Sequence, residues 1–448
     1  MIQTTAKVLI TALSFALCLA GCSSPSVLLR PTGRSSAVAT DPEPEFSQYV
    51  RDQRSLILKA LDEISATGQS AFLGGYSNQE ASLMRAPFQI PENDGDVCSE
   101  SVKGGGKGFL LIHGLTDSPY LMRSTAESLH KAYPCARIRA VLLPGHGTVP
   151  GDTLHMTHEE WLRITDYGVR SFEKDQGVRD VYLVGFSTGT ALALRQVKDK
   201  RNIGKVKGLV LLSPALKAKS SLIWLSGLVG TFSDWESIFS ERDAARYESF
   251  SYNAATEFYK LTKELADGTY KLDIPLLMAV SADDATIDAT AARRFFCDAT
   301  SGTRRALIWY HSRYTDDKTA PRCADIAEIE LNDIARQYNG TRFRFANMAH
   351  IAVPVSPGDR HYGVNGVYRN CKSYAGNGNP ADFANCQKGS AKTVFGENNI
   401  GTANEKQALD YDYWRRGTFN PDYDRLEKSI VCFVDNACNM ADVLDLSK

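Results

Sequence analysis

The sequence predicts an α/β fold in which a mostly parallel central sheet is covered by helices on both faces. Short apolar runs alternate with segments of helical periodicity between residues 108 and 310. The runs are almost continuously apolar, which is typical of parallel strands buried on both faces. The run at residues 181–184 leads through a glycine-rich turn into the helix-forming sequence 190–195, so strand, turn and helix follow one another directly.

Size and charge limit the classes of partner. The chain has 448 residues, of which 43% are hydrophobic, so it can bury a sizeable core and could hold two or three domains. Its formal net charge is −1, without the basic surplus of a nucleic-acid-binding protein. We therefore expect no nucleic-acid partner, and we expect a monomer.

The first 21 residues have the pattern of a secretory signal peptide, with one lysine, no acidic residue and an apolar core too short to span a bilayer. They end in Leu-Ala-Gly-Cys, which resembles a bacterial lipobox. Cys22 would then be the lipidated N-terminus, and the two serines after it favour anchorage to the outer membrane. An ordinary signal peptide with a chance cysteine is the alternative. Residues 22–45, rich in Ser, Pro and Thr, are predicted to be a flexible tether to a domain at 46–448.

The elements of this domain follow in order. Apolar residues recur at helical spacing from Phe46 and predict a packing helix that ends at about Ala66. Thr157 and Glu160 form a capping box that starts a helix to about Lys174. Further strands are predicted at residues 108–112, 137–142, 206–212, 275–280, 305–310 and 341–345, and further helices near 124–132 and from about 290.

One interval, residues 214–273, contains no predicted strand. We interpret it as a mainly helical cap insertion over the strand ends. Its apolar side chains either seat the insertion on the core or line an acyl-binding slot, and packing is the more frequent role for a single residue. They include Leu222, Ile223, Trp224, Leu225, Leu228, Val229, Phe232, Trp235, Phe239, Phe250, Tyr252, Phe258 and Tyr259.

The last part of the chain, residues 358–448, is predicted to be a disulfide-pinned extension with helices at 405–416 and 422–434. Besides Cys18 and Cys22 the chain has an even number of cysteines, which indicates disulfides in an exported protein. No cysteine has a histidine at zinc-ligand spacing, and we expect no metal and no cofactor. Pairing cysteines that are neighbours in the sequence gives Cys98–Cys135, Cys297–Cys323, Cys371–Cys386 and Cys432–Cys438.

The turn after residues 181–184 contains Gly185, Ser187 and Gly189 in the pattern Gly-x-Ser-x-Gly. Between a strand and a helix, this pattern is the nucleophile elbow of α/β-hydrolases. The sharp turn lifts the serine hydroxyl above the sheet edge, and glycines are needed where a Cβ would clash. The alternative interpretation is a glycine-rich turn with an incidental serine.

A serine nucleophile needs a base to take its proton and a carboxylate to orient that base. In α/β-hydrolases the acid comes between the serine and the histidine along the chain. Asp284 comes just past the predicted strand 275–280, at the sheet edge where catalytic groups gather, and is the candidate acid. Asp283 and Asp288 are the alternatives.

The base should follow the last strand. His350 comes shortly after the predicted strand 341–345 and is the candidate. His361 is the alternative, in a more polar loop, whereas His311 follows an earlier strand and is expected to be structural.

The oxyanion formed on attack needs preorganised N–H donors. One is the residue after the nucleophile, Thr188. The other should come from the loop after an early strand, and the candidate there is the backbone N–H of Leu115.

Three motifs together resemble the bacterial carboxylesterase and monoacylglycerol lipase branch of the α/β-hydrolases. They are His-Gly-Leu-Thr-Asp-Ser-Pro at 113–119, Leu-Pro-Gly-His-Gly at 143–147 and the serine turn at 185–189. The resemblance covers residues 107–352 and implies a cap between two late strands, where the insertion falls. The long interval from Asp284 to His350 and the cysteine-bearing extension depart from the compact members, which leaves the substrate open.

Four further side chains have a structural or a metal-binding interpretation. His146 is expected to shape the turn near the site. His155, His158 and Glu159 suggest a metal site, but they do not form His-Glu-x-x-His, and we expect no metal there.

The sequence therefore predicts a lipid-anchored serine hydrolase that cleaves carboxylic esters of acyl lipids, or similar apolar esters, through an acyl-enzyme. An acyltransferase with the same triad, which passes the acyl group to an acceptor other than water, is the first alternative. A non-catalytic binding protein on a hydrolase scaffold is the second.

Overall fold

The structure is a computed structural model. It describes residues 26–34, 42–70, 75–92, 104–175, 177–200, 203–220, 222–266, 271–299, 304–312, 319–331, 336–338, 341–343, 347–369 and 417–436, with the single residues 345, 371, 381, 384, 385 and 388.

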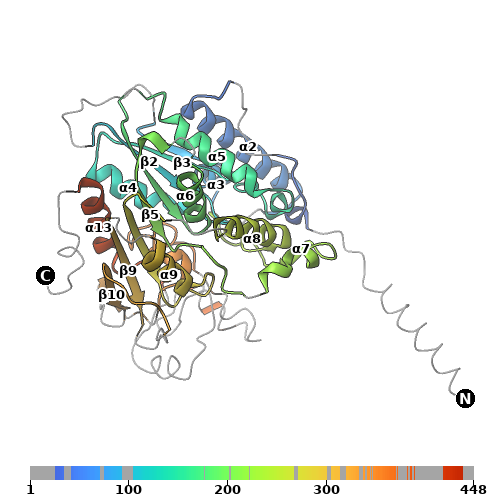
Figure 1. Ribbon diagram of the computed structural model, residues 1–448. Coiled ribbons are helices and arrows are strands. Elements are labelled where there is room, and N and C mark those ends of the chain that lie inside the picture. Colours follow the sequence, from blue (N-terminus) through green and yellow to red (C-terminus); the bar gives the residue numbers. More distant parts are fainter. Residues whose placement is uncertain are drawn as a thin grey trace, which may run out of the picture.

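Eight strands form the central sheet, in the order β1-β3-β2-β4-β5-β8-β9-β10 (Figure 1). Within this sheet β1 pairs antiparallel with β3, and the other neighbours pair parallel. The predicted α/β class is confirmed. The strands are β1 Phe88–Ile90, β2 Lys107–Ile112, β3 Arg137–Val141, β4 Asp180–Phe186, β5 Val206–Leu212, β8 Leu276–Ser281, β9 Arg305–His311 and β10 Ile326–Glu330.

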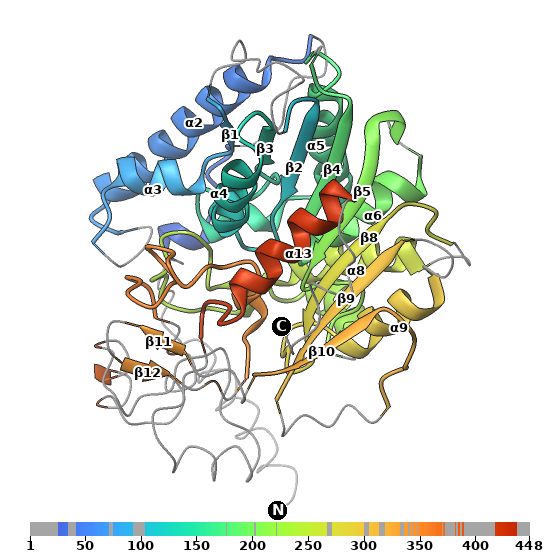
Figure 2. The ribbon, with the colours of Figure 1, turned by 90° about the vertical axis from the view of Figure 1, so that its left-hand side faces the viewer.

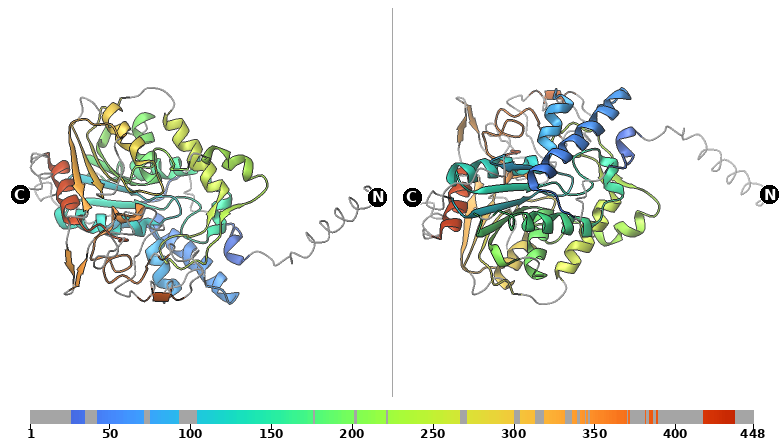
Figure 3. Two further views of the ribbon diagram at one scale, coloured as in Figure 1. Left: turned by 90° about the horizontal axis from the view of Figure 1, so that it is seen from below. Right: turned by 90° about the horizontal axis from the view of Figure 1, so that it is seen from above.

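Helices cover both faces of this sheet, so its central strands are buried on both sides (Figure 3). On one face lie α3 (Asn78–Arg85), α4 (Arg123–Ala132) and α13 (Tyr423–Asp435), and Figure 2 shows α13 crossing over the strands. On the other face lie α5 (His158–Ser171), α6 (Thr188–Lys198), α8 (Tyr252–Ala266) and α9 (Ala289–Ala299). Burial on both faces explains why β2, β4, β5 and β8 are nearly continuous apolar runs.

Two predicted helices have the local features that were expected of them. The helix α2 spans Phe46–Ala66 and buries Ile57, Leu61 and Ile64 along one stripe. The helix α5 begins with the predicted capping box, in which Thr157 accepts a hydrogen bond from the Glu160 N–H and Glu160 accepts one from the Thr157 N–H. Both boundaries follow from local sequence alone.

The sequence pattern did not reveal α3, β1 or β10. The strand β10 carries partly exposed and acidic residues at the sheet edge, so it lacks the apolar run of a central strand. The predicted strand at 341–345 forms as β12 (Thr341–Phe343), but it pairs antiparallel with β11 (Arg336–Tyr338) in a separate two-stranded sheet. His350 follows this strand as expected, but the strand lies outside the main sheet, because the pattern identifies a strand and not its partner.

The tether was predicted to be flexible throughout, and this is wrong for residues 26–34. A short 3-10 helix, η1 (Val27–Leu29), packs against a second one, η3 (Pro150–Leu154). The backbone N–H and hydroxyl of Thr32 both donate hydrogen bonds to the Asp152 carboxylate, at 2.6 and 2.7 Å. Composition could not indicate a contact across 120 residues of sequence.

The cap insertion is helical at η5 (Ile223–Leu225), α7 (Ser226–Val229) and α8. The prediction that it contains no strand is wrong, because Trp235–Ser237 (β6) pairs antiparallel with Phe250–Ser251 (β7). These strands are two or three residues long, too short to be recognised from alternation.

In the C-terminal extension, α13 matches the second predicted helix, and the first, at 405–416, lies outside the described residues. The predicted disulfide Cys297–Cys323 is present. Cys135, Cys371 and Cys432 are also disulfide-bonded, and their predicted partners Cys98, Cys386 and Cys438 lie outside the described residues, as does Cys22. None of the helices in the described part of the chain has the length and apolarity needed to cross a membrane.

Candidate active site

The serine turn joins the end of β4 to the start of α6. Ser187 has φ 52° and ψ −121°, a strained backbone conformation for a residue with a Cβ. An added Cβ on Gly185 would lie 2.5 Å from the Gly189 carbonyl oxygen, and one on Gly189 would lie 2.0 Å from the Ile112 carbonyl oxygen. Both glycines are therefore required by close backbone contacts, and they allow the helix to start immediately behind the serine.

The three residues predicted as a triad lie in one hydrogen-bonded chain. The Ser187 hydroxyl is 2.8 Å from Nε2 of His350, and Nδ1 of His350 is 2.5 Å from Oδ2 of Asp284. Because an ionised carboxylate only accepts, Nδ1 donates to Asp284, and Nε2 is left to accept the serine proton. All three side chains are buried, Asp284 completely.

Each member of the chain is held by further hydrogen bonds. The other oxygen of Asp284 accepts the N–H groups of Thr286 and Ile287, at 2.8 and 3.0 Å. The Ser213 hydroxyl, at the end of β5, donates to the His350 carbonyl at 2.9 Å. These contacts fix the carboxylate and the imidazole relative to the carboxyl ends of the strands.

The alternative acids have other partners. Asp283 accepts a hydrogen bond from the Ser312 N–H at 3.0 Å, and Asp288 caps α9 and pairs with Lys217. Neither carboxylate makes the contact with His350 that Asp284 makes.

The alternative histidines also lie elsewhere. His361 is buried between Tyr76 and Asp243, with ring nitrogens 2.9 and 2.7 Å from their oxygens. His311 contacts the Ser312 carbonyl. Geometry therefore selects Asp284 and His350 from the sequence candidates.

The two predicted oxyanion donors lie beside the serine. Leu115 and Thr188 line the same cavity as Ser187, and Thr188 is the first residue of α6, where backbone N–H groups have no acceptor within the helix. Among the described residues neither N–H has a hydrogen-bond acceptor. Gly114 must be glycine here, because its Cβ would lie 2.8 Å from the Ser187 Cβ.

Two residues of the cap insertion contact the loop that follows β2 and were not singled out from the sequence. The Tyr247 N–H donates to the Thr116 carbonyl at 2.8 Å, and Arg246 lies 3.6 Å from the Asp117 carboxylate. Their contacts depend on how the insertion folds back onto the loop, for which the linear sequence carries no signal.

The sequence model of the Alpha/beta hydrolase family matches residues 109–359, more than half of the chain. The chain belongs to this family. The stretch contains the serine turn, Asp284, His350 and the cap insertion.

Two relatives are similar over part of this hydrolase. A carboxylesterase of Bacillus subtilis (strain 168) is 21% identical over 215 residues, 46% of this chain and 84% of the relative. A thermostable monoacylglycerol lipase of Bacillus sp. (strain H-257) is 25% identical over 218 residues, 47% of this chain and 84% of the relative.

Two solved structures are also similar to about half of this chain. The monoacylglycerol lipase of Paleococcus ferrophilus has a TM-score of 0.37 at 19% identity, over 47% of this chain and 86% of its own. The monoglyceride lipase of Saccharomyces cerevisiae, a soluble variant in complex with a substrate analog, has a TM-score of 0.38 at 14% identity, over 50% of this chain and 82% of its own.

A cavity of about 710 Å³ opens over the Ser187 hydroxyl of this hydrolase. Apolar side chains of the cap insertion line much of it, and Lys219, Glu236 and Arg246 add charged groups. The sequence could not separate packing residues of the insertion from cavity residues, and the structure does so. The apolar residues of the insertion that line the cavity include Leu222, Ile223, Leu225, Val229, Phe250 and Phe258.

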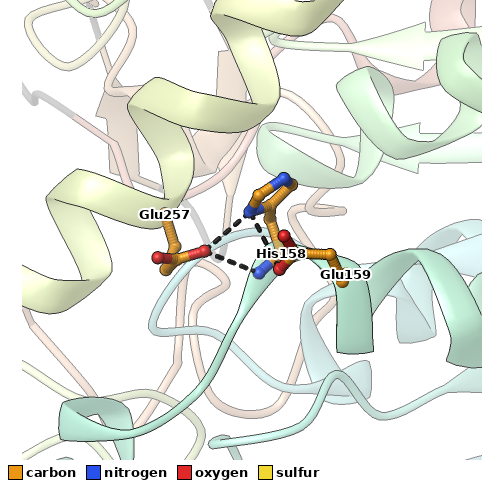
Figure 4. A group of neighbouring side chains, drawn as sticks. All are labelled: His158, Glu159 and Glu257. Carbon is orange, nitrogen blue, oxygen red and sulfur yellow. Dashed lines mark hydrogen bonds and ion pairs between the residues drawn. The ribbon is translucent and has the colours of Figure 1, made fainter.

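A second group of side chains, His158, Glu159 and Glu257, has donor atoms close enough to hold a metal ion (Figure 4). His155, which the sequence had grouped with them, is not a member. Glu257 is already engaged, since the ring and backbone N–H of His158 lie 2.6 and 3.0 Å from one of its oxygens and Lys260 lies 2.7 Å from the other. Although burial opposes it, these bonds lower the pKa of Glu257. The hydrogen bonds from His158 to Glu257 link α5 to α8.

Two buried histidines, in the turns at 113–119 and 143–147, act as acceptors for the backbone. Nε2 of His113 accepts the Leu143 N–H, and Nε2 of His146 accepts the Thr116 N–H, each at 3.0 Å. Burial lowers the pKa of His113 well below its usual value and that of His146 to about 4. Both rings are therefore neutral in the folded protein, as acceptance at Nε2 requires. The expectation that His146 shapes the turn agrees with this contact.

These pKa values predict how stability depends on pH. Below about pH 6.5 the unfolded chain protonates His146 and the folded protein does not, so the free energy of unfolding decreases as the pH falls from about 6.5 to about 4. Each such histidine contributes a slope of about 1.4 kcal/mol per pH unit within this window. Urea denaturation of wild type and His146→Asn, between pH 7 and pH 5, measures the slope. The variant should be less stable at pH 7 and less pH-dependent, and equal slopes would contradict the prediction.

Proposed function

We propose that this hydrolase cleaves carboxylic esters through an acyl-enzyme on Ser187. The observation that supports the proposal best is the hydrogen-bonded chain from Ser187 through His350 to the buried Asp284, at the floor of a mostly apolar cavity. A serine, a base and an orienting carboxylate in this order activate the hydroxyl for attack.

In the proposed mechanism the Ser187 oxygen attacks the ester carbonyl while Nε2 of His350 takes its proton. Asp284 accepts from Nδ1 and stabilises the imidazolium that forms. The N–H groups of Leu115 and Thr188 bind the oxyanion. His350 then protonates the departing alcohol, and an attacking water, deprotonated by the same ring, releases the acid and restores Ser187. An alcohol or amine in place of this water would give acyl transfer, which product analysis in mixed acceptors would detect.

The cavity suggests the class of ester. Its volume and the apolar residues of the insertion suit a medium-to-long acyl chain, and the charged side chains Lys219, Glu236 and Arg246 suit a polar alcohol portion. The names of the two relatives, a carboxylesterase and a monoacylglycerol lipase, support the same class. We therefore propose acylglycerols or similar lipid esters as substrates.

We also propose that the protein is exported and anchored to the outer membrane through acylated Cys22. The support is the signal pattern and the Leu-Ala-Gly-Cys sequence that ends it. Several acyl chains on one cysteine would anchor the protein stably, whereas a single chain would not.

A fluorophosphonate probe tests the nucleophile. Wild type should react covalently at Ser187, and Ser187→Ala should not react and should lose ester hydrolysis by a factor on the order of 10⁶. Peptide mass spectrometry locates the adduct. A folded wild-type protein that refuses the probe, or an adduct on another residue, would end the proposal.

The neighbouring residues Asp283 and Asp284 allow a matched comparison that tests which carboxylate orients His350. Asp284→Asn should lower kcat on the order of 10⁴-fold, because the amide no longer fixes the required tautomer of His350. Asp283→Asn should have a small effect, because that carboxylate binds Ser312. Steady-state kinetics on a soluble p-nitrophenyl ester measures both. Comparable losses in the two variants would contradict the assignment.

A further inference from the structure

The cap insertion exposes an unusual concentration of apolar side chains. Among the described residues, six of the eight large hydrophobic side chains that are exposed belong to it. Phe232 is 85% exposed, and Leu228 is 63% exposed. Single exposed hydrophobic residues are normal, but such a concentration in one short segment indicates an interaction site. We call these six side chains the apolar face, and Leu222 among them also lines the rim of the cavity: Leu222, Trp224, Leu228, Phe232, Ile238 and Phe239.

The helical part of this segment is apolar on two sides. Ile223, Leu225 and Val229 line the cavity, while Trp224 and Leu228 are exposed. A surface helix in water normally has a polar outer side. Residues 220–233 contain no charged side chain. Some apolar side chains of this segment therefore line the cavity, while others, such as Trp224 and Leu228, are exposed to solvent.

The N-terminal end of the described chain lies at the same end of the molecule as the apolar face. Figures 1 and 3 show η1 beside the end that carries α7. Contacts through η3 connect them: Thr32 donates to Asp152 of η3, and Asn253 of α8 donates to the carbonyl of Thr153 at 2.9 Å. Residues 26–34 are therefore connected to the cap insertion through η3.

This position limits where a membrane anchor could be. Cys22 precedes Ser26 by four residues, a distance of at most about 14 Å when fully extended. If Cys22 is acylated, the bilayer surface lies within this distance of η1. The short connection would bring the end of the molecule that carries α7 to the membrane.

We propose that the apolar face inserts into the surface of a lipid bilayer and is a second membrane contact beside the acylated cysteine. Residues 220–233 are uncharged, and the only charged residues between Leu222 and Phe239 are the acidic Asp234 and Glu236. Burial of apolar surface therefore drives the binding, and anionic lipid does not strengthen it. Residues of the same segment line the cavity over Ser187, so an ester would pass from the bilayer into the site under the insertion. Only this last consequence rests on the proposed ester hydrolysis.

Vesicle flotation of the unacylated chain 23–448 tests the apolar face without the anchor. This chain keeps every contact described above, since the described residues begin at Ser26. It should float with phosphatidylcholine vesicles, with or without anionic lipid and at high salt. The triple variant Leu228→Ser/Phe232→Ser/Ile238→Ser should lower the ratio of bound to free protein at least about tenfold. None of these three residues lines the cavity.

The remaining two exposed hydrophobic residues supply a matched control. Leu83→Ser/Val367→Ser removes exposed apolar side chains outside the insertion and should float like wild type. Absence of wild-type binding, equal losses in the two variants, or binding that needs anionic lipid and disappears at high salt would overturn the proposal. So would a dimer in solution that the triple variant dissociates, because a second copy would then cover the face. Flotation measures no turnover, so it is independent of ester hydrolysis.

A labelled full-length protein avoids relying on a variant that could misfold. A fluorophore on Phe232→Cys in the anchored protein should be quenched by lipids that carry a spin label in the bilayer. The same fluorophore on Lys131→Cys should not be quenched, because this residue of α4 has an 81% exposed side chain and α4 lies far from α7 in Figure 1. Equal quenching at the two positions, or none at 232, would overturn the proposal.

Discussion

The hydrogen bonds that join Ser187, His350 and Asp284 require three distant segments of the chain to meet at one place. Ser187 precedes His350 by 163 positions, and their side chains meet at 2.8 Å. Asp284 precedes His350 by 66 positions, and their side chains meet at 2.5 Å. Ser187 also occupies a backbone conformation that costs roughly 1–3 kcal/mol. Such strain persists only where the surroundings leave no alternative. Here Gly185, Gly189 and the end of β2 pack so closely that the turn has one arrangement.

The parallel sheet brings the carboxyl ends of its strands to one edge, where residues that are distant in the sequence come close together. Ser187 follows β4, Asp284 follows β8 and the oxyanion loop follows β2, all at the carboxyl edge of the sheet. His350 comes from outside the sheet, and its segment is held from two sides. Ser213 binds the His350 carbonyl, and Asn420 of the C-terminal extension binds the backbone of Val353 and Val355. The extension therefore supports the position of the base.

The sequence could predict what local pattern determines. The apolar strands, the capping box at Thr157 and the glycines around Ser187 each follow from short-range chemistry, and the triad candidates follow from their order after strands. The sequence could not predict which distant segments of the chain pair or form hydrogen bonds with each other. It missed β10, whose acidic edge lacks an apolar run, and it assigned β12 to the wrong sheet. It predicted that residues 26–34 belong to a flexible tether, because the hydrogen bond from Thr32 to Asp152 joins positions 120 residues apart and leaves no local signal. For the same reason it could not tell that Val229 faces the cavity while Phe232 faces outward.

The central claim is that Ser187 becomes acylated because His350 and Asp284 are in place around it. Rapid-quench mass spectrometry with a p-nitrophenyl ester measures this directly, since the acyl group adds a known mass to the peptide that contains Ser187. In wild type an acyl adduct on Ser187 should form and decay during turnover, and it should be absent in His350→Gln. Turnover of the ester with no adduct on Ser187, or an adduct that forms equally fast without the imidazole, would contradict it.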